Sequence, residues 1–354
     1  MNKKLMKALL SGILVVGTVL PTYLVLSSKI ERVDFSPDHK PQFIGPLAIN
    51  SALESGIHLG KGALKGPEGT AIDENGFIYT GTLDGHIYKV SLENTVEKYA
   101  YIGGHPVGMD FDSHGNLYVC VPDQGLFMVT PERETKQVVK DIGFSNDVKV
   151  ASDGMVYFTD STTKFAFKDY MLDMMEAGSN GRLLRYNPIN NDVEVILEGL
   201  HFANGLTFSE DESYLLVNES SRSQTRKVWL KGSKKGKDEV FVSNLPGYPD
   251  GITTTNSGNY LITFFAKRMN TLDFLHKYPL LKQAAASLPS SMMPTASPHG
   301  LMVLVSGEGE YLESYHDESG EVSTNITSAR QVGDKVVLGS LTENQLVIVD
   351  IDNL

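Results

Sequence analysis

One pattern recurs six times along this chain and constrains its fold more than any other feature. It consists of a small-residue turn, a short apolar strand, a turn rich in Asp, Asn and Gly, and a second apolar strand. The copies occupy residues 67–81, 105–119, 145–159, 202–217 and 248–263, with a degenerate sixth copy at residues 327–340. Turns of the Asn-Gly, His-Gly and Asp-Gly type join antiparallel strands into hairpins. Third strands follow several copies, at residues 85–90, 125–129 and 181–186. Such repetition favours a radial all-β architecture.

The spacing of the copies sets the number of blades. The inner strands begin at Gly69, Gly108, Asp147, Gly205, Gly251 and Ala329, at intervals of 39, 39, 58, 46 and 78 residues. A four-stranded propeller blade needs roughly 40–50 residues. The surplus lies near residues 164–180 and 267–298, where the patterns predict helices, the second pair broken at Pro279. We expect a six-bladed β-propeller over residues 46–354 with two helical insertions, closed by a strand from residues 46–59. A β-sandwich is the alternative.

The start of the chain has a different character. Lys3, Lys4 and Lys7 precede the uncharged stretch of 19 residues at 8–26. About 17–25 apolar residues span a bilayer, whereas the apolar part of a secretory signal has about 7–15. We therefore expect a cytoplasmic segment at 1–7, a signal anchor forming an N-terminal transmembrane helix at 8–28, and a linker at 29–45. This predicts a single-pass type II membrane protein with an extracytoplasmic propeller. A cleaved signal peptide is the alternative.

Charge and cysteine content exclude other classes. The chain has 43 Asp and Glu against 31 Lys and Arg, a net charge of −12, and nucleic-acid binding would need a basic face. The single cysteine, Cys120, excludes an intrachain disulfide. It lies in an apolar strand at residues 117–121, which predicts a buried structural side chain and not a nucleophile.

A candidate metal site follows from the repeat. In a propeller, the residues just before the inner strands meet at one mouth of the central channel. Four copies place an oxygen-bearing side chain there: Glu68, Asn146, Asn204 and Asp250. Ca²⁺ prefers such ligands and binds about 6–8 oxygens in all. A zinc site would need a cluster of His and Cys, and the sequence shows none. Each residue alone also suits an ordinary turn, but their shared position predicts a Ca²⁺ site.

Several motifs resemble a known family. Residues 156–164, 169–172, 181–184, 202–206, 244–251, 271–275 and 312–317 are similar to strictosidine synthase-like and adipocyte plasma membrane-associated proteins, and the likeness covers about residues 45–354. The resemblance implies a six-bladed propeller related to gluconolactonases, paraoxonases and diisopropylfluorophosphatase. In those relatives a Glu, two Asn and an Asp hold a channel calcium, and this motif falls on the four residues above.

The resemblance also implies a reaction, the Ca²⁺-dependent hydrolysis of a small-molecule ester or lactone. Asp250 is the expected nucleophile or base, and His105 is expected to assist water activation. Asn146 and His299 are candidate substrate-binding residues. The base of strictosidine synthase is replaced by Gln331, which disfavours C–N bond formation. A non-catalytic interaction scaffold with a structural calcium is the alternative.

The second insertion has three interpretations. Its apolar residues are Leu272, Phe274, Leu275, Tyr278, Leu280 and Leu281. They could form a lid over an apolar substrate pocket, an interfacial helix that contacts the membrane, or a simple packing surface against the propeller edge.

Overall fold

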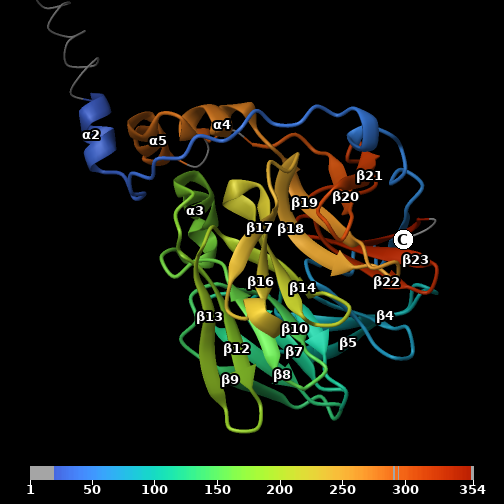
Figure 1. Cartoon of the computed structure of the whole chain (residues 1–354). Coiled ribbons are helices and arrows are strands. Elements are labelled where there is room, and N and C mark those ends of the chain that lie inside the picture. Colours follow the sequence, from blue (N-terminus) through green and yellow to red (C-terminus); the bar gives the residue numbers. More distant parts are fainter. Residues whose placement is uncertain (1–19, 290–291, 294, 352–354) are drawn as a thin grey trace, which may run out of the picture.

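The computed structural model describes residues 20–289, 292–293 and 295–351 (Figure 1). Within these residues the strands form six four-stranded antiparallel sheets. Their inner strands contact one another around a closed ring, in the order β2, β6, β10, β14, β18, β22 and back to β2. The predicted six-bladed β-propeller is therefore confirmed.

Each blade consists of strands that follow one another along the chain. Blade 1 contains β2 (Thr70–Ile72), β3 (Ile78–Gly81), β4 (His86–Val90) and β5 (Val96–Tyr101). Blade 2 contains β6 (Met109–Phe111), β7 (Leu117–Val121), β8 (Gly125–Val129) and β9 (Thr135–Val139). Blade 3 contains β10 (Ser145–Val150), β11 (Val156–Asp160), β12 (Gly181–Asn187) and β13 (Asp192–Leu200). Blade 4 contains β14 (Ala203–Phe208), β15 (Tyr214–Glu219), β16 (Gln224–Trp229) and β17 (Asp238–Val242). Blade 5 contains β18 (Gly247–Thr254), β19 (Tyr260–Lys267), β20 (Gly300–Val305) and β21 (Tyr311–Asp317).

Blade 6 combines both ends of the ring. It contains β22 (Ile326–Val332), β23 (Lys335–Ser340), β24 (Leu346–Asp350) and, at its outer edge, β1 (Ile57–Leu59). β1 pairs antiparallel with β24, placing Ile57 opposite Ile348. The expected closing strand is thus confirmed, and hydrogen bonds between distant parts of the chain close the ring.

Both helical insertions lie where the intervals were too long. The first, between β11 and β12, contains the 3₁₀ turn η3 (Phe167–Asp169) and helix α3 (Tyr170–Glu176). The second, between β19 and β20, contains α4 (Asn270–His276) and α5 (Pro279–Ala286), and Pro279 begins α5. Proline is tolerated there because the first helical N–H has no intrahelical partner. Three further 3₁₀ turns are η2 (Gly45–Leu47), η4 (Ser220–Arg222) and η5 (Gly232–Lys234).

The N-terminal part of the structure begins with helix α2 (Leu20–Leu26). Among the residues that the structure describes, no helix is long and apolar enough to cross a membrane. The expected transmembrane helix is therefore not seen, and residues 1–19, which hold most of it, lie outside the described part. The following segment, predicted as a linker, runs along α5 and α4 and continues towards blade 6 (Figure 1).

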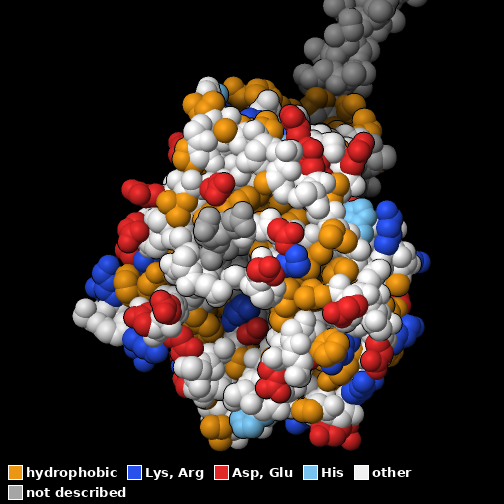
Figure 2. Space-filling model, turned by 90° about the vertical axis from the view of Figure 1, so that its right-hand side faces the viewer, with side chains coloured by type: hydrophobic (Ala, Val, Ile, Leu, Met, Phe, Trp, Pro, Cys, Tyr) orange, Lys and Arg blue, Asp and Glu red, His pale blue; other side chains and the backbone are white. Residues whose placement is uncertain are grey.

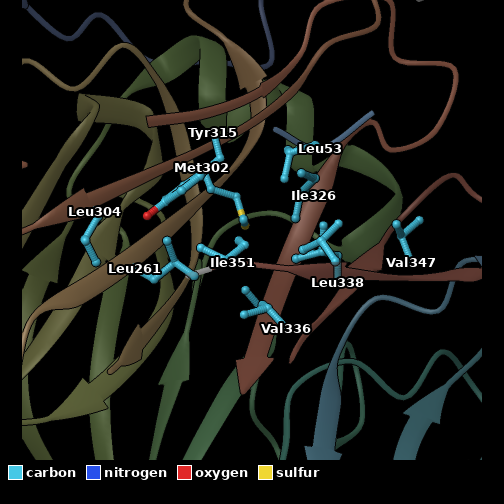
Figure 3. Packing of buried hydrophobic residues seen from close by; sticks show 12 residues of the cluster. Leu53, Leu261, Met302, Leu304, Tyr315, Ile326, Val336, Leu338, Val347 and Ile351 are labelled. Atoms are coloured by element: carbon cyan, nitrogen blue, oxygen red, sulfur yellow. The ribbon is translucent and has the colours of Figure 1, made fainter. Parts of the chain in front are cut away.

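The hydrophobic core lies between the blades. Between blades 5 and 6, for example, Leu261 and Met302 pack with Ile326 and Leu338 (Figure 3). Because both faces of a blade are covered by its neighbours, a central strand can be apolar along its whole length, as in β7, where all five residues are buried. Cys120 is a buried free thiol in that strand, as expected.

Candidate metal centre at the channel mouth

The inner strands approach each other closely at one end of the channel, and glycine makes this possible. A Cβ added at Gly69 would lie 2.0 Å from the carbonyl oxygen of Val107, and one at Gly205 would lie 2.5 Å from that of Asp250. Both glycines therefore allow backbone of the next blade to pass where a side chain would clash. The recurrent glycine of the repeat marks this convergence.

Three of the expected ligands lie at irregular points of the inner strands. The strand register shifts between Ser145 and Val148 in β10, between Ala203 and Leu206 in β14, and between Pro249 and Ile252 in β18. Asn146, Asn204 and Asp250 occupy these three irregular stretches. Bulges of this kind redirect side chains and are common beside functional sites. The same irregularity thus occurs at the same position of three blades.

The two expected carboxylate ligands interact with each other, Glu68 from a buried position and Asp250 from a half-buried one. Burial, followed by the charge of Asp147, raises the pKa of Glu68 to about 8. Burial, followed by the charges of Glu68 and Asp147, raises the pKa of Asp250 well above its usual range. A hydrogen bond from the Asn204 side chain opposes the latter shift. Neighbouring buried carboxylates disfavour each other's charge, so this pair requires protons or a cation.

The two asparagines are held by an identical arrangement in adjacent blades. The amide Nδ2 of Asn146 donates to Ser161 Oγ at 3.0 Å, and that of Asn204 donates to Ser220 Oγ at 3.1 Å. Ser161 Oγ in turn donates to the carbonyl oxygen of Ala203 at 2.7 Å, and Ser220 Oγ to that of Pro249 at 2.6 Å. Since a hydroxyl has one proton, each serine must accept from its amide. The nitrogen of each amide is therefore fixed, which leaves Oδ1 for another partner.

This donor set fits a hard divalent cation. Glu68 Oε2 is buried without a hydrogen-bond partner. Within the described residues, Glu68 forms an ion pair with His105 and with no other residue. Asp250 has no Lys or Arg partner there. Two carboxylates and two amide oxygens suit Ca²⁺ in charge and in ligand type. The described residues contain no group of three or more His, Cys, Asp or Glu side chains placed to hold a metal, so a site here depends on the two amides.

His105 lies beside the same group. Its Nε2 is 3.0 Å from the carbonyl oxygen of Gly66, and its Nδ1 is 3.6 Å from Glu68 Oε2. Because a carbonyl can only accept, the proton is assigned to Nε2, and Nδ1 carries the lone pair. Burial lowers the pKa of His105. The imidazole is therefore a neutral base with its free nitrogen directed at the candidate centre.

An aromatic wall adjoins the mouth, which the sequence reasoning missed. Phe144, Phe202 and Tyr248 each stand two residues before Asn146, Asn204 and Asp250, and all three belong to one buried apolar cluster with residues of α3, α4 and α5. Phe144 and Phe202 meet edge to face, with ring centroids 5.6 Å apart. An aromatic residue two positions before three of the four candidate ligands was the sequence pattern that could have predicted this wall.

Helix α3 brings Tyr170 close to the carboxylates. Burial, then the charges of Glu68 and Asp250, raises the pKa of the Tyr170 phenol. The centroids of the Tyr170 and Phe265 rings are 6.4 Å apart. The Tyr170 ring also stacks on Phe167, and Phe167 packs against the ring of His105. The first insertion therefore contributes one side of the candidate site.

Two further acids hold the loops that carry the asparagines. Asp160 Oδ1 accepts the N–H of Phe144 at 2.8 Å and Oδ2 accepts Arg182 Nε at 3.1 Å. In blade 4, Glu219 occupies the equivalent strand end. It accepts the N–H of His201 at 3.0 Å and Arg226 Nε at 3.1 Å. Both carboxylates are fully buried. In each blade, a buried acid that is paired with an arginine thus holds the backbone just before the asparagine.

Asp147, another residue missed as a site residue, lies deeper in the ring. Its Oδ1 accepts the N–H of Val148 at 2.9 Å, and its Oδ2 accepts that of Leu206 in the next blade at 3.1 Å. Burial raises its pKa, and the charges of Arg330 and Lys149 oppose the shift. Asp147 therefore joins blades 3 and 4 below the mouth.

The structure does not bring His299 to this group. His299 precedes β20, the third strand of blade 5. Its Nε2 is 2.9 Å from Nδ1 of His316, and its ring stacks on Phe43. Burial lowers the pKa of His299 to about 4, and the charges that act on it come from Lys267, His316 and Asp317. His299 thus belongs to the outer part of its blade.

Gln331 also lies elsewhere. Its Nε2 donates to the carbonyl oxygen of Gly333 at the β22–β23 turn, 3.3 Å away. The hydroxyls of Thr327 and Ser328 instead reach the mouth, each donating to the carbonyl oxygen of Glu68 at 2.7 Å. The expectation that Gln331 occupies the position of a catalytic base is not supported by this placement. Blade 6 presents hydroxyls there and not a carboxylate.

Comparisons with known proteins agree with the fold. A family model described as "Strictosidine synthase" matches residues 132–233, and one described as "Strictosidine synthase-like, N-terminal" matches residues 45–90. The rat protein named adipocyte plasma membrane-associated protein is 32% identical over 352 residues, covering 91% of this chain and 93% of the relative.

Solved structures with the same architecture include a gluconolactonase from Xanthomonas campestris. It has a TM-score of 0.61 and 16% identity, and the match covers 90% of this chain and 99% of that one. The structure of a calcium-binding protein, regucalcin, from Agrobacterium tumefaciens has a TM-score of 0.58 and 13% identity, covering 82% and 91%. At these identities the likeness is one of fold.

Proposed function

The chain belongs to the family of adipocyte plasma membrane-associated and strictosidine synthase-like proteins, and from this membership and the channel mouth we propose that it is a Ca²⁺-dependent hydrolase of esters or lactones. One observation carries the proposal. Glu68, which is buried, and Asp250, which is half-buried, interact electrostatically, and Asn146 and Asn204 at equivalent points of blades 3 and 4 have their side-chain nitrogens fixed by serines. The structural neighbours named gluconolactonase and regucalcin support the reaction class through their fold.

Glu68, Asn146, Asn204 and Asp250 would hold the ion. The bound ion would supply a positive charge that polarises a substrate carbonyl and stabilises negative charge on its oxygen. Nδ1 of His105 accepts a proton from the attacking water, since this nitrogen bears the lone pair. Asp250 acts as the nucleophile on the carbonyl carbon or as a second base. A single turnover in ¹⁸O-labelled water, followed by mass analysis of the Asp250 peptide, distinguishes these two roles.

The aromatic wall supports the choice of substrate class. Phe144, Phe202, Tyr248 and Tyr170 place apolar rings beside the carboxylates. Phe144, Phe202 and Tyr248 are themselves buried against the insertions, so we propose that they exclude water from the site and favour an apolar ester or lactone beside them.

Membrane anchoring is part of the proposal. The relatives are named for association with the plasma membrane, and this chain carries three lysines followed by the uncharged residues 8–26. We place residues 1–7 in the cytoplasm and the propeller on the extracytoplasmic side, as a single-pass type II protein.

The function is tested by a panel of aryl esters, lactones and phosphotriesters, assayed with and without chelator. We expect turnover of esters or lactones that chelator abolishes and Ca²⁺ restores. Glu68→Gln and Asp250→Asn should each remove it, whereas Glu74→Gln, an exposed acid at the other end of β2, should not. If the Ca²⁺-loaded protein hydrolyses no compound, the proposal fails and the non-catalytic scaffold replaces it.

A further inference from the structure

One end of the molecule exposes large apolar side chains on three helices. The set comprises Leu20, Tyr23 and Leu26 of α2 together with Phe274, Tyr278, Leu280 and Leu281 of the second insertion, each between 47% and 81% exposed. We call this set the helical apolar surface. In Figure 1 the three helices lie together at the top of the molecule, and Figure 2 shows hydrophobic side chains gathered at that end. Exposed apolar side chains grouped in this way mark an interaction site.

The N-terminal sequence identifies what covers this surface. Helix α2 contains the last seven residues of the uncharged stretch 8–26, and Ser287 Oγ, just after α5, donates to the carbonyl oxygen of Leu24 at 2.7 Å. Nineteen residues precede Leu20. The last twelve of them, residues 8–19, carry no charge. A stretch suited to a bilayer therefore ends beside α5.

The charge of the second insertion agrees with a membrane contact. No Asp or Glu occurs between Asp273 and Glu308, in a chain whose net charge is −12. Lys277, between α4 and α5, is exposed and basic. A membrane with anionic lipid would therefore not repel this part of an otherwise acidic protein.

The orientation of the surface relative to the propeller is fixed by buried polar contacts. Lys282 of α5 is fully buried and donates from Nζ to the carbonyl oxygen of Glu176 at 2.9 Å and to that of Val33 at 3.3 Å. Glu176 Oε2 accepts the N–H of Glu31 at 2.7 Å, and Gln283 donates to the carbonyl oxygen of Ile30 at 3.1 Å. The segment after α2, the second insertion and α3 are thus joined to one another by hydrogen bonds.

This assembly adjoins the channel mouth. Leu272 of α4 and Ala286 of α5 belong to the same buried cluster as Phe144, Phe202 and Tyr248, which flank the candidate ligands. The helices therefore have one apolar side on the mouth and another exposed to the surroundings. The same helices thus connect the exposed surface to the residues that flank the candidate ligands.

We infer that the helical apolar surface lies in the interfacial layer of the lipid bilayer, so that the channel mouth faces the membrane and receives lipophilic esters or lactones dissolved in it. The docking part of this inference is independent of catalysis, while the substrate part rests on the proposed function. A surface of this composition binds the interface in proportion to the apolar area that it buries.

Fluorescence quenching tests the docking. The full chain is reconstituted in phosphatidylcholine vesicles, with an environment-sensitive label on Phe274→Cys or Leu280→Cys and, as control, on Ile189→Cys. Ile189 is 86% exposed in the β12–β13 turn, at the opposite end of the molecule. Cys120 is fully buried, so unmodified protein should remain unlabelled.

Lipids with a nitroxide on the acyl chain should quench the label at positions 274 and 280 and leave position 189 unchanged. Equal quenching at all three positions overturns the inference. Shielding of positions 274 and 280 from both the lipid quencher and aqueous iodide also overturns it, since a protein partner or a second copy then covers the surface.

Kinetics test the substrate. The variant Leu280→Glu/Leu281→Glu should lower kcat/KM for a long-chain aryl ester in vesicles about tenfold, because charge disfavours the interface. It should leave a short-chain, water-soluble ester with the same leaving group within about twofold, as should the control Ile189→Glu. Equal loss on both esters contradicts the inference. If wild-type protein hydrolyses neither ester, the proposed function fails, and the quenching result still decides the docking.

Discussion

The imidazole of His105 and the carboxylate of Glu68 face each other at 3.6 Å between Nδ1 and Oε2, and neither atom has a hydrogen-bond partner. Buried polar atoms are normally paired, so this gap is unusual in a protein interior. It lies where a cation or a water would satisfy both atoms. The contact thus joins the two functions proposed for the mouth, since Glu68 holds the ion and His105 accepts the proton.

Replacement of His105 should separate these two functions. In His105→Gln, we expect kcat for ester hydrolysis to fall about 10²-fold, the usual contribution of a positioned base. Ca²⁺ affinity, measured by calorimetry, should change little, because His105 is not one of the four oxygen donors. A loss of Ca²⁺ binding as large as that of Glu68→Gln would show that His105 is part of the ion site.

Removal of the serines should weaken the ion site without touching its ligands. Ser161→Ala and Ser220→Ala free the nitrogens of Asn146 and Asn204, and we expect each to raise the Kd for Ca²⁺ by about 10–100-fold. Ser145→Ala is the matched control. This buried serine donates to carbonyl oxygens of Val121 and Gly125 and not to an amide of the site. If all three variants bind Ca²⁺ equally well, the amides are not oriented by serine.

The paired acid of blade 3 should contribute strongly to stability. Asp160→Asn removes the charge opposite Arg182 in a fully buried position, and we expect a loss of about 3 kcal/mol in the free energy of unfolding. Glu194→Gln, which breaks the exposed pair with Arg185 in the same blade, should cost less than about 1 kcal/mol. Urea denaturation measures both. Equal costs would contradict the structural role of Asp160.

The histidine pair of blade 5 should make the fold sensitive to acid. Burial, followed by the charge of Lys267, lowers the pKa of both His299 and His316 to about 4, whereas a histidine in the unfolded chain has a pKa of about 6.5. As the pH falls from about 6.5 to 4, the unfolded chain binds protons that the folded chain does not, so the free energy of unfolding decreases.

This sign predicts a difference between variants. Wild-type protein should lose more stability than His299→Gln between pH 7 and pH 4.5, by on the order of 2 kcal/mol. Urea denaturation at the two pH values gives the difference directly. A loss of stability that is the same in both proteins would show that His299 is protonated in the folded state.

The repeat in the sequence was sufficient to predict the fold, because its phase has a physical cause. Gly69, Gly108, Gly205 and Gly251 mark points where backbone meets backbone, so they recur wherever an inner strand enters the mouth. The same phase predicts Glu68, Asn146, Asn204 and Asp250 as the ligands. Three of these residues lie at register shifts of the inner strands. The prediction did not need these shifts, but they give a structural reason why the three positions are equivalent.

Residues that depend on register between strands could not be predicted. Ser161 and Ser220 follow their asparagines by 15 and 16 residues, and only the pairing of the first two strands brings them together. His299 shows the opposite case. The long insertion before it concealed that β20 is a third strand, which is separated from the channel by β18 and β19.

The pairing of β1 with β24 has a consequence for biosynthesis. Residues 57–59 emerge from the ribosome early, but their partners at 346–348 are made almost 290 residues later. Until then β1 has no strand to pair with. The ring therefore cannot close fully before residues 346–348 have been made, so the pairing that seals it is a late event for a chain that begins to fold during synthesis.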